Sequence, residues 1–303
     1  MKRATFFASV VVLIFAFAIL NAPKTPVKLI SPELPKEKIL GLNQWFPEEV
    51  LGVKSPEFQI SAKAAFFIDS KNGEVLFAKN VSEKMPIASL VKVMTVLIAL
   101  EHRNIDDKFI VSKSAAEMEP DKMFLIEGEI LTLRELLDGI FLVSANDAAE
   151  LLAEKVAGGR EEFIKLMNNK AIQLGMKDTY FANPTGLDED EGNSFSTSYD
   201  LALLTRYLIR SYPLVIEISQ NPHIYLPPTT NHRDYDMYSG INLLTTYPGV
   251  IGFKTGYTPE AGLTLITLAR KDGNEIIGVL LGSVSRRDEA RELLDYSFKK
   301  LGV

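Results

Sequence analysis

The stretch PIASLVK, residues 86–92, places Ser89 three residues before Lys92 at the start of a long apolar segment. The residues that follow, 90–101, are apolar and numerous enough for a buried helix. Residues three apart share a helix face, so the Lys92 ammonium can reach the Ser89 hydroxyl. An ammonium among apolar side chains loses proton affinity and can then serve as a base. Because serine also caps helices routinely, this pair becomes informative only together with other motifs.

Strand signals lie on both sides of this helix. Residues 64–69 read as a buried strand, and an Asn-Gly turn returns the chain through a second strand at 74–79. Two further strands, 262–270 and 275–282, flank a turn near the other end of the chain. The other predicted helices are 131–142, 147–156, 160–174, 199–210 and 286–301. The sequence therefore predicts an α/β (α+β) fold, an antiparallel sheet flanked by helices with an all-helical subdomain inserted at about 105–210.

The N-terminus has the layout of an export segment. Residues 1–22 begin with Met-Lys-Arg and continue as an almost uninterrupted apolar run. This arrangement is typical of a secretory signal, and the run is short for a bilayer span of about 20 residues. The segment is expected either to be cleaved or to remain as an N-terminal membrane anchor. Residues 23–60 are rich in proline and are expected to form a stiff tether, with a single folded domain over 61–303.

The composition excludes several functional classes. The net charge of −6 does not indicate a nucleic-acid-binding surface. The chain contains no cysteine, which removes disulfides, thiolate metal sites and a cysteine nucleophile. Its three histidines, His102, His223 and His232, lack metal-ligand spacing, so a histidine metal site is not expected. The arginines expected on the exposed face of the last helix are Arg286, Arg287 and Arg291.

Two more short motifs carry polar side chains that catalysis can use. SAN, residues 144–146, follows an apolar run and precedes a helix, about 55 residues after Ser89. KTG, residues 254–256, continues a strand pattern about 110 residues further on. A strand edge with lysine and threonine presents an ammonium and a hydroxyl, and glycine there lets a substrate backbone come close. Each motif alone is also explained as a helix cap or a strand end.

S-x-x-K, S-x-N and K-T-G in this order and at these spacings resemble the three motifs of active-site serine penicillin-binding enzymes. The chain is similar in particular to the low-molecular-mass penicillin-binding proteins, the serine-type D-Ala-D-Ala carboxypeptidase family, from about residue 62 to 298. Further matching stretches are FANPTGL at 181–187 and GVIGFKTGYT at 249–258. The resemblance implies a β-lactamase/transpeptidase-like fold, with residues 61–303 as the catalytic domain.

The resemblance also implies acyl transfer through a serine ester, with Ser89, Lys92 and Ser144 as the catalytic residues. Lys92 would take the Ser89 proton, and Ser89 would attack the carbonyl of the penultimate D-alanine. Backbone N–H groups of Ser89 and Tyr257 would form the oxyanion hole. Ser144 would pass a proton to the departing D-alanine, and water would then release the shortened peptide without a metal or cofactor.

Five further residues are implied to bind substrate: Asn146, Lys254, Thr255, Gly256 and Tyr257. Asn146 would hold the peptide amide, Lys254 would supply positive potential, and Thr255 would bind the terminal carboxylate. The expected partners are peptidoglycan stem peptides, with β-lactams as covalent inhibitors. The expected location is extracytoplasmic, in the periplasm or at the cell surface. Because the chain ends soon after the third motif, membrane attachment is expected only through an uncleaved N-terminal segment.

Three alternative functions remain open. A D,D-endopeptidase that cuts peptidoglycan cross-links would use the same site. A β-lactamase shares the motifs, although its commonest class has Ser-Asp-Asn where this chain has Ser-Ala-Asn. A non-catalytic wall-binding protein is disfavoured because the motif residues are intact. Val91, Thr185 and Tyr257 depart from residues that are common in the family, which leaves substrate preference open.

Overall fold

The computed structural model describes residues 59–188 and 192–303. Its chain divides into two units, Met1–Glu33 and Leu34–Val303, and all described residues belong to the second. The predicted signal or anchor, and all but the end of the predicted tether, lie outside the described residues. Within the described part of the chain, no helix combines the length and the apolar character that a bilayer crossing needs.

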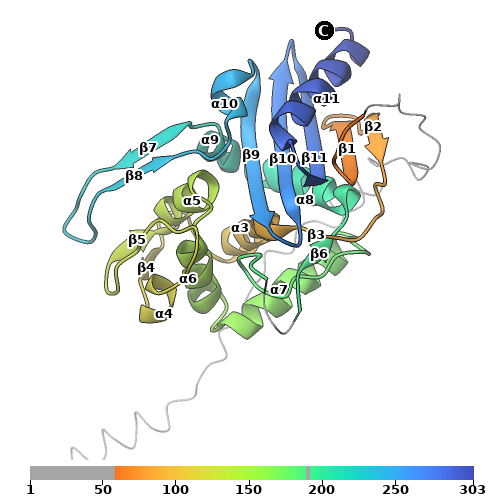
Figure 1. Ribbon diagram of the computed structural model, residues 1–303. Coiled ribbons are helices and arrows are strands. Elements are labelled where there is room, and N and C mark those ends of the chain that lie inside the picture. Colours follow the sequence, from red (N-terminus) through yellow and green to blue (C-terminus); the bar gives the residue numbers. More distant parts are fainter. Residues whose placement is uncertain (1–58, 189–191) are drawn as a thin grey trace, which may run out of the picture. The chain divides into compact units, whose positions relative to one another are not determined.

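A five-stranded antiparallel sheet organises the domain, in the spatial order β2-β1-β11-β10-β9 (Figure 1). The strands are β1 Ala64–Asp69, β2 Val75–Lys79, β9 Val250–Thr258, β10 Gly262–Lys271 and β11 Asn274–Ser283. The predicted hairpins, β1 with β2 and β10 with β11, are both present. Segments more than 200 residues apart in the sequence meet where β1 pairs with β11, which confirms the prediction of a sheet assembled from distant segments.

Side chains alternate between the two faces of β1, as strand geometry requires. Phe66 and Ile68 join one buried cluster, and Phe67 joins the other. Helix α11, Arg286–Lys300, covers the Phe67 face with Leu293 and its neighbours. Helix α8, Ser198–Ser211, covers the opposite face together with the long helix that follows the first motif. The sheet is therefore a central layer between helices (Figure 1).

The inserted region is mainly helical, as expected. Its helices are α4 Lys113–Ala116, α5 Leu133–Leu142, α6 Asn146–Val156, α7 Arg160–Gln173 and, at its end, α8. Helix α5 begins at a capping box, in which Thr132 and Glu135 satisfy each other's backbone N–H groups. Two short ladders also occur, so this region is not helical throughout. They pair β4 Lys108–Ile110 with β5 Ile130–Thr132, and β3 Met85–Pro86 with β6 Phe195–Ser196.

Three elements between α8 and β9 have no counterpart in the sequence predictions. They are α9 Leu214–Ser219, α10 Leu243–Thr246 and the hairpin of β7 His223–Leu226 with β8 Tyr235–Tyr238. Each is four to six residues long. Such segments are too short to display a hydrophobic period, which is the signal that identifies a helix or strand from sequence.

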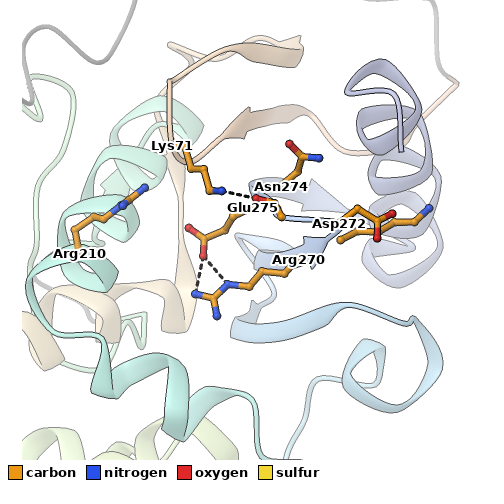
Figure 2. A pocket seen from close by; sticks show the side chains of 8 residues that line it. Lys71, Arg210, Arg270, Asp272, Asn274 and Glu275 are labelled. Carbon is orange, nitrogen blue, oxygen red and sulfur yellow. Dashed lines mark hydrogen bonds and ion pairs between the residues drawn. The ribbon is translucent and has the colours of Figure 1, made fainter.

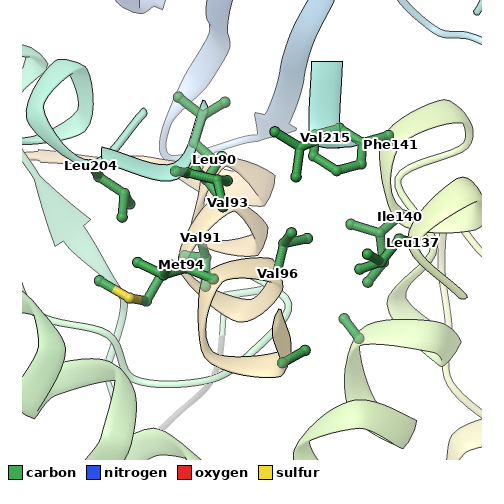
Figure 3. Packing of buried hydrophobic residues seen from close by; sticks show 14 of the residues in the cluster. Leu90, Val91, Val93, Met94, Val96, Leu137, Ile140, Phe141, Leu204 and Val215 are labelled. Atoms are coloured by element: carbon green, nitrogen blue, oxygen red, sulfur yellow. The ribbon is translucent and has the colours of Figure 1, made fainter. Parts of the chain in front are cut away.

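The core surrounds the helix that carries the first motif. A 3₁₀ turn, η1 Ala88–Val91, leads into α3 Lys92–His102, which confirms the predicted buried helix with a tighter first turn. Figure 3 shows its apolar side chains between α5 and α8, with Val96 facing Ile140 and Leu137. Packing on all sides fixes the position and rotation of α3. The residues at its N-terminal end are thereby held against β9 and β10.

Candidate active site

Ser89 and Lys92 lie within hydrogen-bond distance, as the S-x-x-K spacing predicts. The Lys92 Nζ donates to Ser89 Oγ at 2.9 Å and to the carbonyl oxygen of Thr185 at 2.6 Å. Lys92 is fully buried and Ser89 is 8% exposed. Burial, and then the charge of Lys254, lower the pKa of Lys92 well below its usual value, against the opposing charges of Asp121 and Asp147. A lysine in this state can accept a proton from the serine.

The segment 183–186 places the Thr185 carbonyl at the lysine. Asn183 Oδ1 accepts hydrogen bonds from the Gly186 N–H at 2.6 Å and the Thr185 N–H at 3.2 Å. A side chain at Gly186 would bring its Cβ to 2.0 Å from the Ala88 carbonyl oxygen, and the φ of Gly186 is +82°. Only glycine fits there. The Thr185 hydroxyl is buried and donates to Asn183.

The second and third motifs meet through another lysine–serine pair. The Lys254 Nζ donates to Ser144 Oγ at 2.8 Å and to the Thr255 carbonyl oxygen at 2.8 Å. Ser144 holds a positive φ of 60°, in the short connection between α5 and α6. Burial, and then the positive charge of Arg286, lower the pKa of Lys254 to about 7, and Asp121 opposes this shift. Lys254 can therefore exchange protons near neutral pH.

Asn146 forms hydrogen bonds to the loop that contains residues 120–121, next to the two lysines. Its side-chain Nδ2 donates to the Pro120 carbonyl oxygen, and its backbone N–H donates to the Asp121 carbonyl oxygen at 2.8 Å. Together these two bonds hold residues 120–121 in place. Within the described residues the buried Oδ1 of Asn146 has no hydrogen-bond partner. Asn146 thus positions the loop, and its predicted contact with a substrate amide stays a prediction.

The K-T-G strand lies directly against the nucleophile. A side chain at Gly256 would place its Cβ 2.9 Å from the Ser89 backbone nitrogen and 2.6 Å from Thr264 Oγ1, so the close approach requires glycine. Thr255 is half-buried, and the Tyr257 side chain is 61% exposed. Because β9 is the outermost strand of the sheet, these residues lie at an edge that an extended peptide can pair with.

Arg286 occupies a different place from the one predicted. Its Nη1 donates to the Gly256 carbonyl oxygen at 2.6 Å and to the Thr264 carbonyl oxygen at 3.1 Å, and burial lowers its pKa. The prediction of an exposed position on α11 is wrong for this residue, because the first turn of the helix lies over β9 and β10. Arg286 also lines a small pocket, together with Gly240, Asn242, Thr255 and Arg287 among others.

Two carboxylates near the site do not stand out in the sequence. The charge of Asp121 raises the pKa of both Lys92 and Lys254, opposing the shifts that burial produces. Asp147 is buried and accepts hydrogen bonds from the backbone N–H groups of Met123 and Leu125, which shapes the same loop. No short motif marks Asp121. The position of Asp147, directly after S-x-N, is the signal that could have found it.

The structure thus brings the predicted residues together from three distant segments. Direct contacts join Ser89 to Lys92, Ser144 to Lys254, and Gly256 to the backbone of Ser89. The charge of Lys254 also reaches Lys92 and lowers its pKa. The arrangement can supply a nucleophile, a base with a lowered pKa, a second proton carrier and a positively charged pocket for an anionic group. The individual roles of these residues stay predictions.

Comparisons with known proteins agree with this geometry. The family model described as D-alanyl-D-alanine carboxypeptidase matches residues 50–285. The D-alanyl-D-alanine carboxypeptidase DacF of Bacillus subtilis is 37% identical over 257 residues, which cover 82% of this chain and 65% of that protein. This chain therefore spans slightly less than two thirds of that relative's length.

Solved structures show the same likeness. The D-alanyl-D-alanine carboxypeptidase of Mycobacterium tuberculosis superposes with a TM-score of 0.76 at 30% identity, covering 82% of this chain and 95% of that one. Penicillin-binding protein D2 of Listeria monocytogenes, in its cefotaxime-bound form, gives 0.70 at 32% identity, covering 80% and 100%. The predicted β-lactamase/transpeptidase-like fold is confirmed. With the family match over residues 50–285, these findings show that the chain belongs to the D-alanyl-D-alanine carboxypeptidase family.

Proposed function

We propose that this protein is a serine-type D-Ala-D-Ala carboxypeptidase that removes the terminal D-alanine from peptidoglycan stem peptides. The observation that carries the proposal is the fully buried Lys92, whose Nζ lies 2.9 Å from the hydroxyl of Ser89. A neutral lysine at that distance activates a serine for attack on an acyl carbon. Family membership supplies the substrate class.

Acylation uses the two lysine–serine pairs in turn. Neutral Lys92 takes the Ser89 proton as Oγ bonds to the carbonyl carbon of the penultimate D-alanine. The developing oxyanion accepts hydrogen bonds from the backbone N–H groups of Ser89 and Tyr257, each worth about 3 kcal/mol in comparable sites. When the C–N bond breaks, the proton that Lys92 took passes through the Ser144 hydroxyl to the leaving D-alanine nitrogen, which makes Lys92 neutral again. The Lys254 ammonium, 2.8 Å from that hydroxyl, stays charged.

Deacylation and substrate binding complete the cycle. Water attacks the serine ester, Lys92 takes the water proton, and Ser89 recovers its hydrogen as the shortened peptide leaves. Before acylation, the peptide lies along the edge of β9, and its free carboxylate enters the positive field of Lys254 and Arg286 beside the Thr255 hydroxyl. The pocket next to Thr255 supports this placement, because its lining includes two arginines.

The same site also suits a D,D-endopeptidase, whose substrate is a cross-linked dimer. The edge of β9 is long enough for either peptide, so a product analysis must distinguish them. A β-lactamase would need rapid hydrolysis of the penicilloyl ester, and a wall-binding protein would need no ester at all. Penicillin-binding family members act on peptidoglycan peptides and bind β-lactams, and these partners are proposed for this chain.

The test combines an adduct with a product. Penicillin treatment of the purified protein should add one penicilloyl mass on Ser89, and a pentapeptide ending in D-Ala-D-Ala should lose one alanine. Lys92→Ala should lose both reactions by several orders of magnitude, because nucleophile and base act as a unit. Lys299→Ala, which changes an exposed lysine on α11, should retain both. An adduct on another residue, or full activity of Lys92→Ala, contradicts the proposal.

Membership of a cell-wall enzyme family implies an extracytoplasmic location. We further propose that residues 1–22 direct export and either are cleaved or anchor the protein in the membrane. Residues 1–56 fused to a reporter should carry it across the cytoplasmic membrane. A reporter that stays in the cytosol refutes this part of the proposal, and the size of the exported fusion distinguishes cleavage from anchoring.

A further inference from the structure

A second pocket lies at the opposite end of the sheet from the catalytic residues. Its volume is about 480 Å³, and the β1–β2 turn, the β10–β11 turn and the end of α8 form its walls (Figure 2). Along β10, Ile266 pairs with Lys254 of the active site, whereas the pocket begins at Arg270. The pocket shares no lining residue with the predicted catalytic set.

Positive charge dominates the lining. It contains two carboxylates, those of Asp272 and Glu275, and four cationic side chains, those of Lys71, Arg210, Arg270 and Lys271. This local excess of cations contrasts with the chain as a whole, whose net charge is −6. A concave surface with one sign of charge concentrates ions of the opposite sign.

One of the two carboxylates is already neutralised inside the wall. Arg270 binds Glu275 through Nε at 2.7 Å and Nη2 at 2.7 Å, as Figure 2 shows. The Ser70 hydroxyl donates to the other oxygen of Glu275. Glu275 therefore has both oxygens engaged, and its charge is matched by that of Arg270.

Two arginines on one face of α8 converge on the same backbone oxygen. Arg206 Nε donates to the Ser70 carbonyl oxygen at 2.8 Å, and Arg210 Nη2 donates to it at 3.2 Å. Burial, and then the charge of Arg210, lower the pKa of Arg206 to about 10, although Glu275 opposes the shift. Like charges four residues apart on a helix repel, and an anion between them and Lys71 relieves that repulsion.

We propose that this pocket binds the phosphate group of a water-soluble phosphomonoester. The planar fork of Arg210 matches two phosphate oxygens, and Lys71 contributes a point charge across the pocket. The side chain of Lys71 is held there by a hydrogen bond to the Gly273 carbonyl oxygen. A single carboxylate would leave most of the cationic lining unbalanced, whereas a phosphate carries more charge and three or more acceptor oxygens.

A soluble ligand fits better than a lipid surface. Membrane-binding patches combine basic residues with apolar side chains that enter the bilayer. Among the described residues, the large exposed apolar side chains lie elsewhere, and none of them lines this pocket. The ligand is therefore expected to enter the pocket from water, with its phosphate facing Arg210.

Titration with inorganic phosphate and with glycerol 3-phosphate, at constant ionic strength, tests the proposal. Calorimetry on the purified protein should show saturable binding, and Arg210→Gln should weaken it about tenfold or more. Lys71→Gln should weaken it too. Arg206 is left unchanged, because it does not line the pocket and makes the shorter of the two arginine hydrogen bonds to the Ser70 carbonyl oxygen. Penicillin acylation at the wild-type rate in both variants shows that the fold is intact.

The chain offers a matched control. A second basic hollow, of about 500 Å³, is lined in part by Arg103, Lys108 and Lys155. Lys108→Gln with Lys155→Gln removes two charges and should leave phosphate affinity unchanged. Equal loss in this control, or unchanged affinity in Arg210→Gln, overturns the proposal. Binding to phosphatidylglycerol vesicles that depends on Arg210 and is tighter than binding to glycerol 3-phosphate overturns the assignment to a soluble ligand.

Discussion

Lys254 lies near enough to Lys92 for its charge to lower the pKa of the Lys92 ammonium, and both side chains are almost fully buried. Two ammonium groups in one low-dielectric site resist being charged together. Each has its own serine partner, so the site contains two proton carriers whose pKa values are lowered by burial and by neighbours. Pairs of this kind divide the roles of base and acid. We expect Lys92 to be the base and Lys254 to remain the charged partner through acylation.

The first prediction concerns Asp121, the carboxylate that opposes both shifts. The charged groups that act on Lys92 are Lys254, Asp121 and Asp147, and those that act on Lys254 are Arg286 and Asp121. Asp121→Asn removes a negative charge, so the pKa of each lysine should fall further. The second-order rate of penicillin acylation should rise with pH as Lys92 deprotonates and fall as Lys254 does. Both limbs of this bell should therefore move to lower pH.

The control for this experiment is Asp106→Asn, which removes an exposed carboxylate that acts on neither lysine. Its pH profile should coincide with that of the wild type. A profile of Asp121→Asn that keeps its position and changes only in height would mean that the residue acts through the shape of the loop. A shift to higher pH would contradict the electrostatic role.

The second prediction is that Lys254 lowers stability in acid. The pKa of Lys254 is about 7 in the folded protein, below its usual 10.5. Between pH 7 and 10.5 this lysine is therefore protonated in the unfolded chain and neutral in the folded one. The free energy of unfolding therefore rises with pH between about 7 and 10.5. Below pH 7 the folded protein bears the whole cost of burying the charged ammonium. Lys254→Met removes that dependence. Its stability relative to wild type should be greater at pH 6 than at pH 9, by about 2–3 kcal/mol.

Urea unfolding of both proteins at the two pH values measures this difference. Lys299→Met changes an exposed lysine and should show the same relative stability at pH 6 and pH 9. If the difference in free energy of unfolding between Lys254→Met and wild type is the same at both pH values, Lys254 stays protonated throughout. The hydroxyl of Ser144 loses its partner in the variant, which affects both pH values alike.

Much of the fold is predictable because its elements are long and strongly patterned. The strand at Ala64–Asp69 and the helix α11 agree with their predicted bounds within a residue or two. Their signals are local: a buried apolar run beside an Asn-Gly turn, and a helical period. The β7–β8 hairpin escapes prediction because each strand has four residues, and the pairing depends on contacts that the sequence pattern does not show.

The residues of the candidate site likewise include some that the sequence identifies and some that it does not. Ser89 and Lys92 are predictable because helix geometry joins residues three apart, and S-x-N and K-T-G are recognisable from their order. Arg286 and Asp121 are not, because their importance comes from tertiary contacts. An amphipathic pattern assigns Arg286 to a solvent face, yet the first turn of α11 brings it to the Gly256 carbonyl. Asp121 lies in a loop that carries no periodic signal.

The third prediction tests the close approach of β9 to the nucleophile. Gly256→Ala would place a methyl group 2.9 Å from the Ser89 backbone nitrogen and 3.1 Å from the Ala88 Cβ, so the strand or the turn must move. A displacement near 1 Å at a reacting group can cost about 100-fold in rate. Acylation should slow by about that factor. Gly240→Ala is the comparison, because its Cβ would come no closer than 3.8 Å to any atom outside its neighbours. Equal rates in the two variants would refute the steric argument.

The last prediction concerns recognition of the free carboxylate, which separates a carboxypeptidase from an endopeptidase. Thr255 is half-buried beside Arg286, and its hydroxyl can direct a hydrogen bond to the terminal carboxylate. A charge-assisted hydrogen bond contributes about 1.5–3 kcal/mol, which corresponds to roughly 10- to 150-fold in kcat/KM. Amidation of the terminal D-alanine should cost at least the lower of these factors. Thr255→Val, which keeps the shape and removes the hydroxyl, should lose most of the preference for the free acid.

The measurement is kcat/KM for free-acid, amidated and cross-linked peptides with wild-type and Thr255→Val proteins. Each substrate reports a different group at the pocket: a carboxylate, a neutral amide, or an amide that continues into a second peptide. Equal rates for the free acid and the amide would remove carboxylate recognition from Thr255 and Lys254. A cross-linked dimer cut fastest would identify an endopeptidase. In that case the pocket must admit a longer chain past Arg286, while acylation of Ser89 by the substrate, with the buried Lys92 as base, would proceed by the same steps.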